Sequence, residues 1–63
     1  MPVINLTMGR ADEDQKTRLI HELTSTASEV TGIPPISFTV VIHEMGGDNI
    51  GWDGKTLSEH TKA

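Results

Sequence analysis

Apolar and polar side chains alternate over residues 3–8, apart from Val3, which is apolar like its neighbour Ile4. The apolar positions are Ile4, Leu6 and Met8, and the polar positions between them are Asn5 and Thr7. A period of two is typical of a β-strand, so we expect a strand over residues 3–8. Gly9 lets the backbone turn after this strand, and Arg10 lies at the strand exit.

A second pattern, with the period of an α-helix, occupies residues 13–31. Its apolar side chains recur at intervals of three and four: Leu19, Ile20, Leu23, Ala27 and Val30. Asp12 and Gln15 have the spacing of a capping box, which favours a helix start. Gly32 suits the C-cap, and two prolines beginning at Pro34 prevent the helix from continuing. We therefore expect an amphipathic helix of about five turns.

Residues 36–44 are rich in β-branched side chains and predict a second strand, apolar on both faces near its middle. A strand, a long helix and another strand form a β-α-β unit, whose strands are parallel and whose crossover is right-handed. The helix can cover only one face of this sheet. Since no other segment is large enough to cover the second face, we expect a second subunit to do so.

The last part of the chain predicts a loop, a hairpin and a tail. Two glycines after the second predicted strand indicate the loop, and residues 50–56 contain Asp53-Gly54, the turn pair of a small β-hairpin. Trp52, the only tryptophan, lies in this hairpin. We expect so small a hairpin to clasp a neighbouring subunit, and the polar residues 58–63 to fray.

The length and composition indicate one domain over residues 1–63 that oligomerises. A chain of 63 residues buries only about 60% of its unfolded surface, which leaves a marginal core. Small domains compensate with disulfides, metals or partner subunits. Because there is no cysteine, disulfides and thiolate metal sites are excluded and oligomerisation remains.

The charge and hydropathy patterns exclude two classes of partner. A net charge of −4 with only five Lys and Arg residues does not provide a surface for nucleic-acid phosphates. No apolar run approaches the roughly 20 residues of a membrane span, and a signal peptide is not indicated. We therefore expect a cytoplasmic protein with neither a nucleic-acid nor a membrane partner.

The candidate chemical group is the amine of Pro2. Proline behind Met1 permits an aminopeptidase to remove Met1, and a free α-amine has a pKa of about 7.7–8.0. Burial or a neighbouring cation lowers that pKa, which would suit a general base near neutral pH. The alternative is that Pro2 only starts a strand where no N–H donor is needed. The three histidines, His21, His43 and His60, are not spaced as zinc ligands, and we expect neither a metal nor another cofactor.

Together these elements resemble the 4-oxalocrotonate tautomerase family, which consists of short β-α-β chains with an amino-terminal catalytic proline. The matching residues are Pro2, Gly9-Arg10, Asp12-Glu13, Gln15-Lys16, Leu19-Ile20, residues 40–45 with Glu44-Met45, and Gly51 with Gly54. The resemblance spans nearly the whole chain. It implies an α/β fold, a β-α-β unit with a small C-terminal hairpin, whose sheet is completed in a homo-oligomer, a hexamer as in family members.

The resemblance also implies site residues. Pro2 matches the catalytic base, and Arg10 matches the arginine that holds a substrate carboxylate. Ile50 falls where the family has an aromatic residue in the apolar pocket wall. Trp52, two residues on and on the same strand face, could supply that aromatic surface, pack in a subunit interface, or do both.

Two departures from the family pattern concern the substrate. The second arginine of the family falls at Thr39, which cannot polarise a carbonyl as a cation does. The segment from Pro2 to Gly9 is about two residues shorter than the family pattern.

The function implied by the resemblance is a tautomerase for small enol or 2-oxo carboxylic acids. Pro2 would be the general acid and base, while Arg10 would anchor the carboxylate and, as a nearby cation, help to keep the amine neutral. One alternative is a hydratase or dehalogenase of unsaturated acids, in which protonated Pro2 acts as an acid. The other is a non-catalytic oligomeric assembly protein, an interpretation that the missing cation at Thr39 supports.

Overall fold

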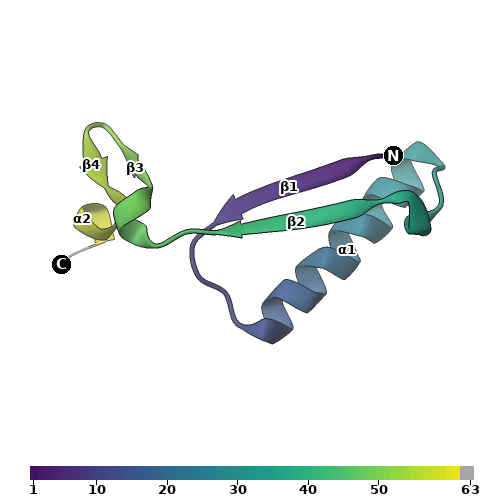
Figure 1. Cartoon of the computed structure of the whole chain (residues 1–63), viewed down its shortest axis with the longest axis horizontal. Helices are drawn as coiled ribbons and strands as arrows, with labels where there is room; N and C mark the ends of the chain where they lie inside the picture. The colour runs from purple at the N-terminus through teal and green to yellow at the C-terminus, as the bar shows by residue number, and fades with distance from the viewer. Residues whose placement is uncertain (62–63) are drawn as a thin grey trace.

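The computed structural model describes residues 1–61, which form two groups of elements (Figure 1). The first group contains the strand β1 (Val3–Met8), the helix α1 (Glu13–Thr31), the 3₁₀ turn η1 (Pro35–Ser37) and the strand β2 (Thr39–Glu44). The second group contains the 3₁₀ turn η2 (Gly47–Asn49), the strands β3 (Gly51–Trp52) and β4 (Lys55–Thr56), and the helix α2 (Leu57–Thr61). A short extended segment after β2 joins them.

The first group is the predicted β-α-β unit. β1 and β2 are parallel, with Ile4 opposite Val40 and Leu6 opposite Ile42. These four side chains are half-buried on the face of the sheet along which α1 lies (Figure 1). The α/β fold class, with its parallel strands and connecting helix, is therefore confirmed.

Local contacts fix both ends of α1 at the predicted bounds. Asp12 Oδ1 accepts a hydrogen bond from the Gln15 N–H at 2.8 Å, and Gln15 Oε1 accepts one from the Asp12 N–H at 3.0 Å. This capping box satisfies two N–H groups that a helix start leaves without partners. At the other end Gly32 adopts a φ of 74°, and its N–H donates to the Ser28 carbonyl at 2.8 Å.

The predicted apolar stripe of α1 is wrong at two positions. Leu19, Leu23 and Ala27 are half-buried, whereas Ile20 is 43% exposed and Val30 is 79% exposed. Ile20 lies about 100° around the helix from Leu19, at the edge of the stripe. After the turn at the helix end, the half-buried apolar side chain is Ile33.

The second strand is shorter than the predicted range 36–44. The N–H groups of Ser37 and Phe38 donate to the carbonyls of the two prolines before them, each at 3.0 Å. These N–H groups are therefore not available for strand pairing. β2 begins at Thr39, whose N–H donates to the Pro2 carbonyl at 3.1 Å.

The predicted hairpin is confirmed as β3 and β4. Asp53 and Gly54 have φ of 55° and 73°, the two positive values that a type I′ turn requires. Gly51 permits the close approach of the two strands, because a Cβ at this position would lie 2.6 Å from the Lys55 carbonyl oxygen.

The expectation that residues 58–63 fray is wrong for the described part of this segment, which lies in α2. Glu59 N–H donates to Thr56 Oγ1 at 3.1 Å, and Thr56 N–H donates to Glu59 Oε1 at 3.0 Å. These two bonds form a second capping box, and it starts the helix. Residues 62–63 lie outside the described residues, so the expectation is not tested there.

The face of the β1–β2 sheet opposite α1 is open in a single chain. Val3 and Val41 are 48% and 37% exposed. No side chain of residues 1–61 is buried, and the chain exposes 4888 Å², against about 4,000 Å² for a compact monomer of this size. The radius of gyration of 14.8 Å likewise exceeds the roughly 11 Å of a compact domain.

Neither α1 nor α2 combines the length and the apolarity that a bilayer span requires.

Candidate active site

Pro2 lies at the start of β1 and is held there by the sheet. Its carbonyl accepts the Thr39 N–H at 3.1 Å, and its side chain is half-buried. The Thr39 hydroxyl lies 3.8 Å from Met1 Sδ, while Met1 itself is 91% exposed. The Pro2 nitrogen is thus attached to an exposed residue whose removal would free a secondary amine at the edge of the sheet.

Arg10 lies in the loop between β1 and α1, and its side chain is exposed. Contacts on either side of it fix the backbone of this loop. The Met45 N–H donates to the Met8 carbonyl at 2.8 Å, and the Ala11 N–H donates to Glu44 Oε2 at 2.8 Å. The capping box of α1 follows directly at Asp12.

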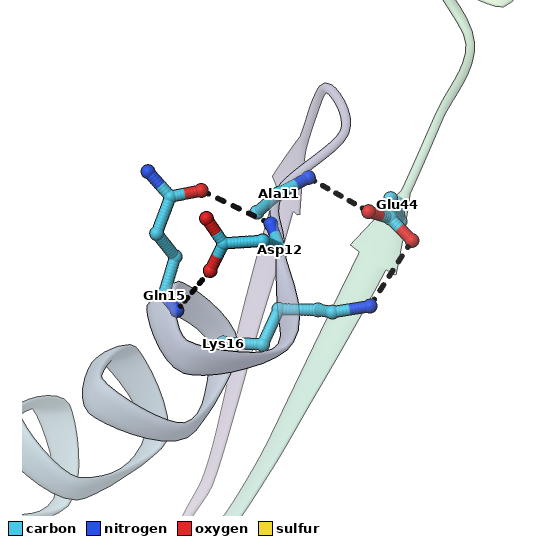
Figure 2. Close-up of polar contacts among 5 residues, drawn as sticks. All are labelled: Ala11, Asp12, Gln15, Lys16 and Glu44. Carbon is cyan, nitrogen blue, oxygen red and sulfur yellow. Dashed lines mark hydrogen bonds and ion pairs between the residues drawn. The ribbon is translucent and has the colours of Figure 1, made fainter.

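Glu44, the last residue of β2, connects that strand to the loop and to the first turn of α1 (Figure 2). Its other carboxylate oxygen, Oε1, accepts from Lys16 Nζ at 3.4 Å. The hydrogen bond from the Ala11 N–H is the main reason why the pKa of Glu44 lies below its ordinary value of 4.5. The Lys16 ammonium lowers this pKa further, and the charge of Arg10 makes a smaller contribution. The stabilisation from these contacts is therefore present above pH 4.5 and is lost as the pH falls through the lowered pKa.

Ile50 and Trp52 line the same hollow, of about 350 Å³, in the hairpin group. Trp52 is 53% exposed, and its ring stacks on that of His60 at a centroid distance of 3.9 Å with 8° between the planes. His60 Nε2 also donates to the Trp52 carbonyl at 3.0 Å. The side chain and the backbone of Trp52 are both held by α2, a contact that the expectation of a frayed tail did not include.

One chain does not bring Pro2 together with the other proposed site residues. Pro2 and Arg10 flank β1 at opposite ends, and its six residues span about 17 Å at about 3.3 Å per step. Ile50 and Trp52 lie in the hairpin group, at the end of the molecule opposite the N-terminus (Figure 1). The expected effect of Arg10 on the Pro2 amine therefore requires Arg10 of another copy.

The cations of residues 1–61 divide into two paired and two unpaired side chains. Lys16 pairs with Glu44, and Arg18 pairs with Glu22 at 2.8 Å. Arg10 and Lys55 form no ion pair with a carboxylate of the described residues. Lys55 lines the hollow beside Trp52, which it faces across the hairpin turn. The sequence signal for this position is the Asp53-Gly54 turn, because Lys55 follows it directly and so pairs with Trp52.

The histidines have structural contacts. His43 Nε2 lies 3.2 Å from Asn5 Oδ1 on the open sheet face, and His60 stacks on Trp52. Within residues 1–61, no three His, Asp or Glu side chains are grouped closely enough to hold a metal ion.

Comparisons with known proteins agree with this architecture. A family model described as "Tautomerase enzyme" matches residues 3–60. A 2-hydroxymuconate tautomerase of Bacillus subtilis (strain 168) is 38% identical over an alignment of 61 positions, and the match covers 94% of this chain and 97% of that protein.

Two solved structures share the fold. A structure of trans-3-chloroacrylic acid dehalogenase is 33% identical with a TM-score of 0.80, covering 89% of this chain and 98% of that one. A heterohexameric 4-oxalocrotonate tautomerase from Chloroflexus aurantiacus J-10-fl has a TM-score of 0.88 and 22% identity, covering 94% of this chain and 97% of that one, and it supports the fold alone. Given the family match over residues 3–60 and these relatives, the chain belongs to the tautomerase family, which includes the 4-oxalocrotonate tautomerases.

Proposed function

We propose that this protein is a tautomerase that interconverts the enol and keto forms of small enol or 2-oxo carboxylic acids, with Pro2 as the general acid and base. The observation that carries the proposal is the position of Pro2 at the start of β1, in a chain whose residues 3–60 match the tautomerase family. The B. subtilis relative, a 2-hydroxymuconate tautomerase, supports the substrate class.

The chemistry requires one group that takes a proton and returns it. The neutral Pro2 amine removes the proton from the enol oxygen, and the resulting ammonium delivers a proton to carbon, so the enzyme ends each turnover unchanged. Such a group works best when its pKa lies near the working pH, and an α-amine begins at about 7.7–8.0. No cofactor is needed for this exchange.

The proposed substrate contacts are Arg10 for the carboxylate, with Ile50 and Trp52 as the apolar wall. Because these residues lie away from Pro2 in one chain, the proposed site is built from more than one copy in a homo-oligomer. The open face of the β1–β2 sheet and the excess of exposed surface support this assembly. We propose a homohexamer, the assembly that the resemblance to the 4-oxalocrotonate tautomerase family implies.

Dehalogenation of an unsaturated acid is the second candidate, and the dehalogenase relative at 33% identity favours it. In that reaction water adds to the carbon that bears the halogen while protonated Pro2 delivers a proton to the neighbouring carbon. The resulting halohydrin then loses hydrogen halide and leaves an aldehyde. Halide release from 3-chloroacrylate, compared with ketonisation of 2-hydroxymuconate and of phenylenolpyruvate, separates the two activities. Activity on none of the three supports a non-catalytic assembly protein.

The decisive experiment compares protein with and without Met1, the two forms being identified by mass. With Met1 retained, the Pro2 nitrogen is an amide without a basic lone pair, so we expect a folded and inactive protein. Pro2→Ala keeps an amine without the proline ring, and a residual rate is expected. The processed protein should show a basic limb in its pH–rate profile with an apparent pKa below about 7.7–8.0. Equal ketonisation rates with and without Met1 would show that Pro2 is not the base.

A further inference from the structure

Glu44 is the side chain that ties the loop carrying Arg10 to the sheet. Its Oε2 accepts the N–H of Ala11, the residue directly after Arg10, at 2.8 Å. Its Oε1 faces Lys16 Nζ at 3.4 Å, so both carboxylate oxygens are oriented by donors (Figure 2). Two residues before Arg10, the Met8 carbonyl accepts from Met45, the neighbour of Glu44.

We propose that Glu44 is a positioning residue for substrate binding: it fixes the backbone beside Arg10 and so keeps the guanidinium in place for the substrate carboxylate. This inference rests on the proposed role of Arg10. Glu44 does not touch the substrate, and its effect is transmitted through the Ala11 N–H.

The physical reason is preorganisation. The Arg10 side chain is exposed and pairs with no carboxylate of residues 1–61, so its own contacts do not hold it. A loop fixed by the Glu44–Ala11 bond and by the helix cap removes backbone freedom that substrate binding would otherwise have to remove. The loop contact therefore affects affinity for the carboxylate more than the proton transfer, which occurs at Pro2.

A purely electrostatic role of Glu44 would have the opposite effect on substrate affinity. Glu44 is close enough to Arg10 for the cation to lower the carboxyl pKa. If Glu44 acted mainly by neutralising Arg10, removal of its charge would strengthen substrate binding. Variants of Glu44 therefore have to change its hydrogen-bond acceptor and its negative charge independently.

Two conservative variants make this separation. Glu44→Gln keeps an oxygen that can accept from Ala11 and removes the charge, whereas Glu44→Asp keeps the charge and is one methylene too short to reach Ala11. With 2-hydroxymuconate as substrate, positioning predicts that Glu44→Asp raises KM about fivefold, the effect of one lost hydrogen bond, and changes kcat less than about twofold. Glu44→Gln should keep KM within about twofold of the unmodified protein.

The matched control is Glu22→Gln, which removes the same charge from the surface pair with Arg18 and should leave KM unchanged. In an Arg10→Ala background, Glu44→Asp should add no further increase in KM, because the two residues act as a unit.

The other possible outcomes contradict either the positioning role of Glu44 or the proposed role of Arg10. A lower KM in Glu44→Gln, or an unchanged KM in Glu44→Asp while Arg10→Ala raises it, overturns the positioning role and leaves the proposed function intact. A rise caused by Glu44→Asp that persists undiminished in the Arg10→Ala background also overturns it. If Arg10→Ala alone leaves KM unchanged, the proposed carboxylate anchor fails, and the inference fails with it.

Discussion

Thr39 is the residue at which the proposed site departs most from the 4-oxalocrotonate tautomerase pattern. It pairs with Val3 in the sheet, its N–H donates to the Pro2 carbonyl, and its side chain is exposed on the open sheet face. Within one chain, a longer side chain at this position therefore displaces no packed group near the start of β1.

We predict that Thr39→Arg increases kcat/KM for a dicarboxylate enol on the order of tenfold. A guanidinium here supplies a charge-assisted contact worth about 1.5–3 kcal/mol, and each 1.4 kcal/mol corresponds to about a factor of ten. The control is Ser25→Arg, which adds the same charge on the exposed side of α1, away from the open sheet face. Steady-state kinetics with the two variants check the prediction, and equal effects would show that the added charge acts only at long range.

At the scale of elements, the sequence predicts those that local contacts determine. α1 has its predicted bounds because Asp12, Gln15 and Gly32 form its caps within a few residues of the chain. The same signal, Thr56 followed three residues later by Glu59, marks the start of α2, but the short polar segment after it has no apolar periodicity that predicts a helix. The β-branched pattern predicts the second strand too long, because it does not reveal that the N–H groups just before Thr39 donate to the carbonyls of Pro34 and Pro35.

The sequence does not predict which of the proposed site residues lie close together in the folded chain. Residue patterns and the resemblance to the 4-oxalocrotonate tautomerase family point to Pro2, Arg10, Ile50 and Trp52, but they do not tell which of these residues meet in one subunit. That depends on the length of β1 and on where the segment after β2 leads, which are properties of the folded chain. The Glu44–Ala11 contact joins residues 33 positions apart, and no periodicity predicts it.

The contacts around α2 predict a fluorescence change in Trp52. Glu59→Ala removes one side of the second capping box and should destabilise α2 by about 1 kcal/mol. Because His60 lies in α2 and stacks on Trp52, fraying of this helix should release the indole and change the emission of the only tryptophan.

The measurement is the emission spectrum in the absence of denaturant, with Asp12→Ala as the control. Asp12→Ala weakens the cap of α1, which does not contact Trp52, and should leave the emission of the folded protein unchanged. An unchanged spectrum in Glu59→Ala would show that the Trp52–His60 stack persists without the cap.

At the scale of the whole molecule, the chain is an elongated subunit that measures 44 × 24 × 15 Å. The half-buried residues of β2, Val40 and Ile42, face α1, while Val41 lies between them on the opposite face. The open face therefore combines apolar Val3 and Val41 with polar side chains such as those of Asn5 and His43. The surface exposed beyond that of a compact monomer, roughly 900 Å², is comparable to the roughly 800 Å² per partner of a standard interface.

We therefore predict that the protein sediments as a multimer at micromolar concentration and that Val41→Asp shifts it toward the monomer. A carboxylate on the open face would be buried against a second subunit without a partner, which opposes association by several kcal/mol. Ser25→Asp, on the exposed side of α1, makes the same charge change away from that face and should leave the sedimentation coefficient unchanged. Because Pro2 and Arg10 lie at opposite ends of β1, the monomeric fraction of Val41→Asp should also lose tautomerase activity. A folded monomer with full activity would show instead that one chain completes the site.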